Sequence, residues 1–272
     1  MVPMRVKLDP VPDPRLPVDM RSSGATWVVI LTGREPPTTP ASEQDRALFV
    51  TLGRALRLTA PEHVLVMLLD AHRAVWAPTL APLPAGNLLS QAQSRGSAIA
   101  LLQALVEIHC RDSEPRLVVM PSQIEVDDER MLMNAITTAQ RIALTFPKDV
   151  ILLGVATSRA DVTREWIVPI LGRPGHSHRV RSLVEDPSPA VACRLAGEGA
   201  LRYSSIFACM GWALYDLFED ALPKVASAYL SGLARGEYGD DHRERIVGEL
   251  PEHDFGRDVL RRRTERLQLV GM

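Results

Sequence analysis

Trp27-Val-Val-Ile-Leu31, followed by Thr32-Gly33, is the clearest structural signal in this sequence. An unbroken apolar run of this length is typical of a strand that is buried on both faces of a parallel sheet. A second apolar run, Val64–Leu69, follows a segment whose apolar residues repeat at helical spacing between positions 47 and 56. We therefore expect a strand–helix–strand unit at the start of the folded region.

The alternation of helix and strand continues toward the middle of the chain. The next expected elements are a helix at Ser97–Ile108, a strand at Arg116–Met120, a helix at Asp127–Leu144 and a strand at Val150–Val155. Beyond residue 160 we expect strands at Glu165–Leu171, Arg179–Glu185 and Leu201–Cys209, and then a mainly helical stretch at Gly211–Leu233. This order predicts an α/β fold with a doubly wound, mostly parallel but mixed sheet.

The first 23 residues differ from the rest of the chain. They are interrupted by Pro3, Pro10, Pro12, Pro14 and Pro17, and closely spaced prolines favour an extended chain over a helix. We expect residues 1–23 to form a proline-rich N-terminal arm and residues 24–272 to form a single domain. The arm is expected to be either a loose tail or a strap around the domain or a partner.

The composition narrows the classes of partner. The chain has 31 Lys+Arg and 33 Asp+Glu, a net charge of −2, which predicts no attraction to nucleic acid or to an anionic membrane. No apolar run approaches the ~20 residues that span a bilayer. Because Cys110, Cys193 and Cys209 form no C-x-x-C pair, we expect reduced thiols in a cytoplasmic protein and no zinc site.

Several motifs that carry chemistry are not found. The sequence has no G-x-S-x-G, G-x-G-x-x-G or Walker A pattern, and Gly33 is the only glycine in the first strand–helix connection. His176 and His178 lie two residues apart, but nothing nearby completes a metal site, so we expect a solvated loop. The run from Arg261 to Arg263 is interpreted as a solvated helix face. We therefore predict no catalytic residue and no metal ligand.

Several short fragments nevertheless resemble a known family, and they occur in that family's order. Val28-Val-Ile-Leu-Thr-Gly33 is similar to the strand that enters the family's nucleotide loop, and Gln91-Ala-Gln-Ser-Arg-Gly-Ser-Ala98 is similar to its Q-P-x-N-R-G-T-A. Glu165-Trp-Ile-Val168 resembles E-Y-G-Y-I, Leu183-Val-Glu-Asp-Pro187 resembles F-V-E-K-P, and Leu250-Pro-Glu-His-Asp-Phe255 resembles L-P-x-x-S-I-D-Y. From Trp27 onward the chain resembles the mannose-1-phosphate guanylyltransferase branch of the sugar-phosphate nucleotidyltransferases.

The resemblance implies a Rossmann-like, three-layer nucleotidyltransferase (GT-A-like) sandwich and a nucleotide or nucleotide-sugar ligand. At the nucleotide it places Gly33, Gln91, Arg95, Gly96 and Ser97. At the sugar it places Glu165, Glu185 and Ser204. Taken by themselves, these residues leave other roles open. Ser97 is also a plausible helix cap, and Glu185 precedes the turn-forming Pro187.

The departures from the family fall on the positions that carry its chemistry. Nucleotidyl transfer needs cations or a metal ion to offset the charge at phosphorus. Gln123 replaces the metal-binding aspartate of L-P-A-D-H, Asp186 replaces the lysine of F-V-E-K-P, and Ser204 replaces the asparagine of W-N-S-G. The segment from Arg34 to Ala41 is too short for the family's G-G-x-G-T-R loop and P-K lysine, and no G-W-S-D motif occurs before Met272.

These departures predict a pseudoenzyme without a cofactor, which binds a nucleotide sugar or regulates an active relative. One alternative is an active, divergent sugar-1-phosphate nucleotidyltransferase that uses Mg²⁺, with Glu125, Asp127 or Asp128 replacing the lost metal ligands. A second alternative is a structural module that contacts a protein partner, or a second copy of the chain, through the N-terminal arm and the Arg-rich C-terminal region.

Overall fold

The computed structural model describes residues 24–33, 43–124, 126–157, 165–170, 177–234 and 240–272. Its strands are β1 (Thr26–Leu31), β2 (Val64–Leu69), β3 (Leu88–Gln91), β4 (Arg116–Pro121), β5 (Val150–Val155), β6 (Trp166–Pro169), β7 (His178–Val184), β8 (Leu201–Met210) and β9 (Leu267–Gly271). Its helices are α1 (Glu43–Leu58), α2 (Asp70–Leu80), α3 (Ser97–His109), α4 (Glu129–Thr145), α5 (Pro189–Gly197), α6 (Gly211–Ala221), α7 (Pro223–Ala234), α8 (Asp240–Glu249) and α9 (Phe255–Asp258). The N-terminal arm lies outside the described residues, so its expected form stays a prediction.

The described strands form one nine-stranded mixed sheet in the order β3-β2-β1-β4-β8-β5-β9-β7-β6. β1 pairs in parallel with β2 on one side, with Val28 opposite Val64, and with β4 on the other, with Val28 opposite Val118. The interior residues of these three strands are buried, as their apolar runs require. The chain therefore runs outward from β1 to β3 and returns to β4 on the opposite side of β1.

The far end of the sheet closes on itself, a feature that the sequence did not predict. β8 pairs with both β5 and β6, so β8, β5, β9, β7 and β6 form a small closed barrel. Closure requires β8 to bend, and its pairing with β5 shifts register between Leu152 and Gly154. A Cβ atom on Gly154 would lie 2.6 Å from the Leu201 Cβ, so glycine permits this close approach. The expected mixed α/β fold is confirmed, whereas the simple three-layer sandwich is not.

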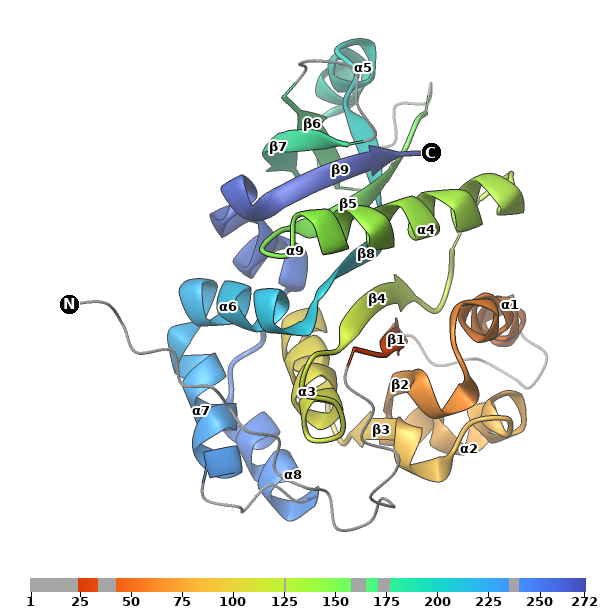
Figure 1. Ribbon diagram of the computed structural model, residues 1–272, viewed down its shortest axis with the longest axis vertical. Coiled ribbons are helices and arrows are strands. Elements are labelled where there is room, and N and C mark those ends of the chain that lie inside the picture. The colour runs from red at the N-terminus through yellow and green to blue at the C-terminus, as the bar shows by residue number, and fades with distance from the viewer. Residues whose placement is uncertain (1–23, 34–42, 125, 158–164, 171–176, 235–239) are drawn as a thin grey trace.

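Helices cover both faces of the parallel part of the sheet (Figure 1). α1, α2 and α4 share one core, which includes Leu52, Trp76 and Ile136. α3 and α6 contribute to a second core on the opposite face, which includes Leu102 and Leu214. This arrangement leaves the carboxyl ends of β1, β2 and β3 as an edge at which loops and helix ends meet.

Some elements differ from the sequence-based expectation. The short β3, the α2 helix with its internal Pro78, and β9 were not predicted. The expected solvated helix at the arginine run is wrong, because Leu260–Arg262 forms a single 3-10 turn and Arg261 is ion-paired with two glutamates. His178 begins β7, and His176 lies outside the described residues.

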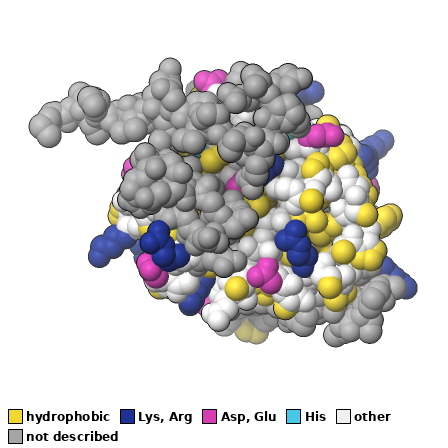
Figure 2. Space-filling view, turned by 90° about the horizontal axis from the view of Figure 1, so that it is seen from below, with side chains coloured by type: hydrophobic (Ala, Val, Ile, Leu, Met, Phe, Trp, Pro, Cys, Tyr) yellow, Lys and Arg dark blue, Asp and Glu magenta, His cyan; other side chains and the backbone are white. Residues whose placement is uncertain are grey.

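The described surface has no dominant positive face in the view of Figure 2. Lys and Arg side chains stand apart there with Asp and Glu among them, and hydrophobic side chains gather on the right of the view. Dispersed charges of both signs do not concentrate a positive potential as a nucleic-acid surface would. Within the described residues, no helix has both the length and the apolar character needed to cross a membrane.

Candidate functional site

The connection from β3 to α3, which the resemblance assigns to a nucleotide, lies against residues 247–258, here called the clamp segment. The His253 amide donates to the Arg95 carbonyl (3.0 Å), and the Ala98 amide donates to the His253 carbonyl (3.1 Å). Between them Gly96 has a φ of 87°, and a Cβ atom there would lie 2.1 Å from the His253 carbonyl oxygen. Glycine is therefore required at position 96 by both the backbone conformation and the close approach.

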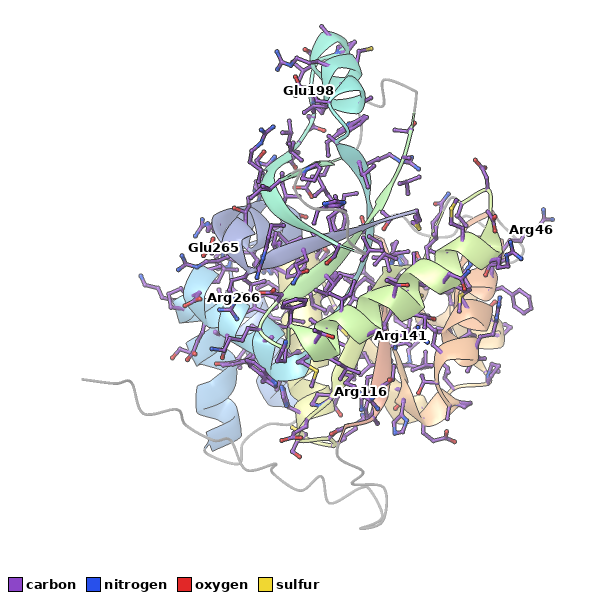
Figure 3. All side chains as sticks on the ribbon, turned by 45° about the horizontal axis from the view of Figure 1, so that its top comes forward. Arg46, Arg116, Arg141, Glu198, Glu265 and Arg266 are labelled. Carbon is purple, nitrogen blue, oxygen red and sulfur yellow. The ribbon has the colours of Figure 1, made fainter. Side chains whose placement is uncertain are left out.

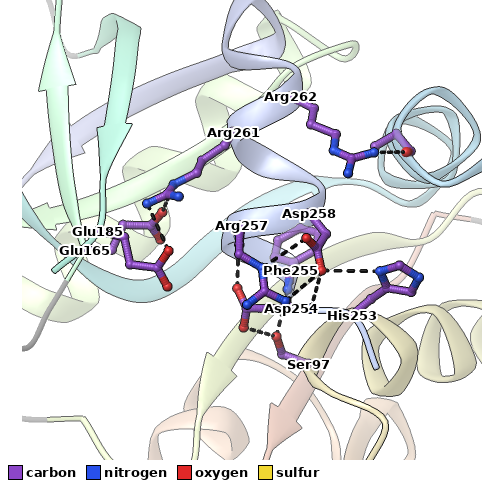
Figure 4. A network of polar contacts seen from close by, with 11 residues as sticks. Ser97, Glu165, Glu185, His253, Asp254, Phe255, Arg257, Asp258, Arg261 and Arg262 are labelled. Carbon is purple, nitrogen blue, oxygen red and sulfur yellow. Dashed lines mark hydrogen bonds and ion pairs between the residues drawn. The ribbon is translucent and has the colours of Figure 1, made fainter. Parts of the chain in front are cut away.

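Ser97 is the first residue of α3 and bonds to the clamp segment (Figure 4). Its hydroxyl donates to Asp254 Oδ2 (2.9 Å) and accepts from the Phe255 amide (2.8 Å). The N-cap of α3 is Gly96, which makes no side-chain bond, so the interpretation of Ser97 as a cap is wrong. Asp254 in turn caps α9 by accepting from the Arg257 amide (2.9 Å).

The Arg95 side chain is held by the same segment. Its guanidinium donates to the carbonyls of Val247 (3.1 Å) and Gly248 (2.9 Å), which lie in the last turn of α8. Carbonyls at a helix C-terminus carry partial negative charge, so a cation is stabilised there. Arg95 thus fixes the end of α8 against the start of α3.

A cavity of about 300 Å³ opens where the carboxyl ends of β1, β2 and β3 meet the start of α3. This strand-end cavity is lined by Leu31, Thr32, Gly33, Met67, Leu68, Leu69, Gln91, Ser94, Gly96, Ser97, Ala100, Glu252 and Asp254. Open α/β sheets bind ligands at such strand ends, where the chain changes direction across the sheet. Four of the five residues expected at the nucleotide therefore meet at one cavity, and Arg95 is the exception.

The strand-end cavity carries negative charge. Glu252 and Asp254 line it, and none of its described lining residues is Lys or Arg. The Ser97 hydroxyl holds Asp254 beside the N-terminus of α3, whose partial positive charge stabilises a carboxylate. Carboxylates accept hydrogen bonds from hydroxyl and N–H groups but repel phosphate. The cavity is therefore suited to the uncharged parts of a ligand.

Glu165 and Glu185 are not among the lining residues of this cavity and pair with Arg261 instead (Figure 4). Arg261 Nη2 lies 3.0 Å from Glu185 Oε2, and its Nε lies 3.4 Å from Glu165 Oε1. Gly256 lets the Glu165 carboxylate approach its backbone, since a Cβ there would lie 2.7 Å from Glu165 Oε2. Burial raises the pKa of Glu165 to about 7; Arg261 opposes this rise, and Asp254 and Glu185 add to it.

The Glu165→Gln variant is expected to gain stability relative to wild type as the pH rises from about 5 to about 8. The pKa of Glu165 rises from an ordinary 4.5 to about 7 on folding, so the folded state binds the extra proton between these values. The wild-type free energy of unfolding therefore falls as the pH rises through this window, and the variant does not share this loss. We expect a relative gain of about 1–3 kcal/mol across the window, measured by urea unfolding at both pH values. A variant whose stability relative to wild type is the same at both pH values would contradict this.

Ser204 uses its hydroxyl within the sheet. The hydroxyl donates to the Leu153 carbonyl (2.7 Å) and accepts from the Ile206 amide (3.2 Å). These bonds brace β8 where Ser205 adopts a φ of 61° and the strand bends toward the barrel. The structure thus gives Ser204 a place in the bend of β8, and its contact with a sugar stays a prediction.

The residues after β4 do not fit the Mg²⁺ that the resemblance implies for an active enzyme. Gln123 is exposed and offers only a neutral amide to a hard cation. Asp128 is the N-cap of α4 and accepts from the Met131 amide (2.9 Å). Glu125 lies outside the described residues. Within the described part of the chain, no three His, Cys, Asp or Glu side chains are close enough to hold a metal ion.

Sequence reasoning missed Glu252, Asp254 and Gln103. The first two belong to the fragment that resembles L-P-x-x-S-I-D-Y, which carried the resemblance but was given no role of its own. Gln103 accepts from Gln91 Nε2 (2.9 Å) and lies on the buried face of α3. A lone glutamine among the apolar residues of a helix was the available signal, because a buried polar group needs a partner.

Comparisons with solved structures show what this fold is similar to. Mannose-1-phosphate geranyltransferase from Thermus thermophilus matches with a TM-score of 0.75 and 24% identity over 90% of this chain and 73% of that one. Mannose-6-phosphate isomerase from Helicobacter pylori matches with a TM-score of 0.71 and 15% identity over 90% of this chain and 97% of that one. A UDP-glucose pyrophosphorylase complexed with UDP-glucose matches with a TM-score of 0.50 and 10% identity over 91% and 90% of the two chains.

Sequence comparisons give no assignment. No protein-family profile matches this chain, and no curated protein does. The structural neighbours are all under 25% identical, so they establish the fold alone. That fold is of the sugar-phosphate nucleotidyltransferase type.

Proposed function

We propose that this chain binds a nucleotide sugar in the strand-end cavity and does not transfer a nucleotidyl group. The observation that carries the proposal is the cavity itself, which lies at the ligand position of an α/β sheet but offers carboxylates instead of cations. The fold supports this class of ligand, and the charge of the cavity supports the proposed loss of transfer chemistry. The proposed role is therefore that of a binding or regulatory protein built on an enzyme fold.

Three positions support the loss of transfer chemistry. An attacked phosphorus needs its developing charge offset by basic side chains or a divalent cation. Gln123 and Asp128 do not form a site for such a cation, because one is a neutral amide and the other caps α4. Asp186 adds a negative charge where the family that the sequence resembles has lysine, in an exposed turn with a φ of 45°. In the strand-end cavity itself, the charged lining groups are Glu252 and Asp254, and these carboxylates would raise, and not lower, the energy of a negatively charged transition state.

The walls of the strand-end cavity favour the uncharged parts of a nucleotide sugar. The Met67–Leu69 strand end provides an apolar surface, and Gln91 provides an amide. Asp254 and Glu252 can each accept a hydrogen bond from a ribose or hexose hydroxyl. A volume of about 300 Å³ holds one such moiety, so the phosphates would lie toward solvent.

Ala100→Leu is expected to weaken nucleotide-sugar binding by about ten-fold, which corresponds to ~1.4 kcal/mol. Ala100 is half-buried on α3 and lines the strand-end cavity, so a larger side chain there occupies ligand volume. Leucine is a good helix former, and the helix should persist. Isothermal titration with GDP-mannose and UDP-glucose measures the effect. Ala74→Leu, at an exposed position of α2, is the matched control and should leave binding unchanged.

The same titrations can contradict the proposal. Failure of the wild-type chain to bind any nucleotide sugar or nucleoside diphosphate would remove the binding role and leave a structural module. Equal binding by Ala100→Leu and the wild type would place the ligand elsewhere.

An activity assay tests the loss of catalysis. Release of pyrophosphate from GTP and mannose-1-phosphate with Mg²⁺ would contradict this loss and favour the divergent transferase. We expect no release above background.

A further inference from the structure

β3 is the free edge of the sheet among the strands that the structure describes. The strand order ends at β3 on one side, whereas on the other side β6 pairs with β8 and closes the barrel. β3 pairs with β2 from Leu88 to Gln91, so its other side presents backbone N–H and C=O groups that no described strand meets. Proteins usually cover or shorten such an edge, because it is a template for the pairing of another strand.

A cavity of about 640 Å³ follows this free edge. Its lining includes the six consecutive residues from Leu88 to Gln93, together with Gln103 on α3 and with Val247 and Gly248 at the end of α8. We call this cavity the edge groove. A groove beside an unpaired strand has the form that accepts an extended peptide, which then pairs with the strand through its backbone.

The two faces of β3 differ in their surroundings. Leu89 and Gln91 are buried, and Leu89 belongs to the core that α3 forms. Ser90 points to the opposite face, where its hydroxyl accepts from the exposed Arg73 (3.4 Å). Because successive side chains of a strand point to opposite faces, a strand added here would place one row against α3 and α8 and the other row toward solvent.

The described chain begins near one end of the edge groove. The Gly24 amide donates to Asp112 Oδ1 (3.1 Å), and the preceding Arg111 donates from Nη2 to the carbonyl of Gly86 (2.7 Å), which lines the groove. The residue after Gly24 accepts from the Arg116 amide (2.9 Å), so this entry point lies beside the start of β4, where Figure 3 labels Arg116. The N-terminal arm therefore joins the domain close to the free edge.

One segment of the N-terminal arm has the sequence pattern of a strand. Met4-Arg5-Val6-Lys7-Leu8 alternates apolar and basic residues, and Pro3 and Pro10 lie on either side of it. Such alternation is typical of a half-buried strand, and proline is tolerated at the ends of an edge strand. The three apolar side chains suit the face toward α3 and α8, and the two basic side chains suit the face toward solvent.

We propose that the segment Met4–Leu8 docks in the edge groove of its own chain and adds a strand beside β3. The connection from Asp9 to Ser23 is long enough, because an extended chain spans ~3.3 Å per residue, or ~50 Å over this stretch. A tethered segment also acts at an effective concentration on the order of millimolar, which favours it over a free partner. The docking needs no ligand in the strand-end cavity, so it stands or fails independently of the proposed function.

Residue-resolved hydrogen exchange of the full chain tests the docking. Val6→Pro removes a backbone donor from the segment and should accelerate exchange of the free-edge amides within Leu88–Gln93 by about ten-fold. The β3 amides that point toward β2, and the amides of β5, should keep their rates. Val11→Pro places the same substitution between Pro10 and Pro12, outside the segment, and as the matched control should leave all these rates unchanged.

A second pair of variants tests which row of the segment faces the domain. Val6→Ser removes an apolar contact with the α3 side and should accelerate exchange of the free-edge amides by about three-fold or more. Lys7→Ser changes the neighbouring side chain, which points toward solvent, and should leave the rates unchanged. All four substitutions lie in the arm, so none of them alters a buried residue of the described domain.

Three results would overturn the proposal. The first is equal exchange of the free-edge amides in the wild type and in Val6→Pro. The second is an acceleration by Val11→Pro or Lys7→Ser that matches the one by Val6→Pro or Val6→Ser. The third is protection of these amides that disappears on dilution together with a dimer in sedimentation, which would show that the arm docks on a second copy of the chain.

Discussion

Gly96→Ala is expected to lower the free energy of unfolding by about 3–5 kcal/mol, from left-handed backbone strain and from overlap with a neighbouring carbonyl. Gly96 has a φ of 87°, which costs any other residue energy. An added Cβ atom would also lie 2.1 Å from the His253 carbonyl oxygen. Backbone on both sides of this contact is fixed by hydrogen bonds between Arg95, His253 and Ala98, so neither side can move without breaking one.

Two other glycines distinguish the cost of backbone strain from the cost of overlap with the neighbouring carbonyl. Gly199 has a φ of 80°, but a Cβ atom added there would have no atom within 4 Å, so Gly199→Ala should cost only the strain, about 1–2 kcal/mol. Gly53 lies inside α1, has no positive φ and has open space around it. Gly53→Ala should therefore stabilise the protein by about 0.5–1 kcal/mol.

Urea unfolding measures the free energy of unfolding of Gly96→Ala, Gly199→Ala and Gly53→Ala, and we expect it to increase in that order. A loss for Gly96→Ala no larger than that for Gly199→Ala would show that the clamp segment can withdraw from α3 at little cost. The same variant should lose ligand binding in the strand-end cavity, because Gly96 and Asp254 line it from opposite sides of this contact.

The parallel half of the fold was predictable from local sequence patterns. β1, β2, β4 and β5 are apolar runs that become buried strands, and a pattern of this kind needs no knowledge of distant contacts. The barrel was not predictable in the same way, because it depends on pairing of β8 with both β5 and β6. Those pairings join residues far apart in the chain, and only one register shift and one positive φ in β8 mark the bend.

The candidate site was likewise predictable only where local sequence patterns were sufficient. The resemblance singled out the β3–α3 connection, and the structure places Gln91, Gly96 and Ser97 at a cavity. It could not show that Asp254 reaches Ser97, because the two lie 157 residues apart in the sequence. The negative charge of the cavity arises from that long-range contact. A prediction of binding could therefore come from sequence, whereas the proposal that the cavity takes an uncharged ligand group required the structure.

Asp112→Ala is expected to lower the free energy of unfolding by about 3 kcal/mol or more, because it leaves one buried donor and three partly buried donors without their acceptor. Asp112 is buried between α3 and β4 and accepts from the backbone amides of Gly24 (3.1 Å) and Ala25 (3.1 Å). It also accepts from Trp27 Nε1 (3.2 Å) and from the Glu114 amide (3.0 Å). One carboxylate thus joins the chain entering β1 to the chain entering β4.

The loss should be concentrated at β1, because three of the four donors lie at its beginning. Hydrogen exchange of the β1 amides should accelerate more than that of β5, alongside a lower urea midpoint. Asp112→Asn should lose about half as much, because its amide oxygen retains acceptor capacity whereas its NH₂ faces donors. Asp127→Ala, at an exposed acid before α4, should change stability by less than ~0.5 kcal/mol. Equal effects of Asp112→Ala and Asp127→Ala would show that the start of β1 is held by its apolar core alone.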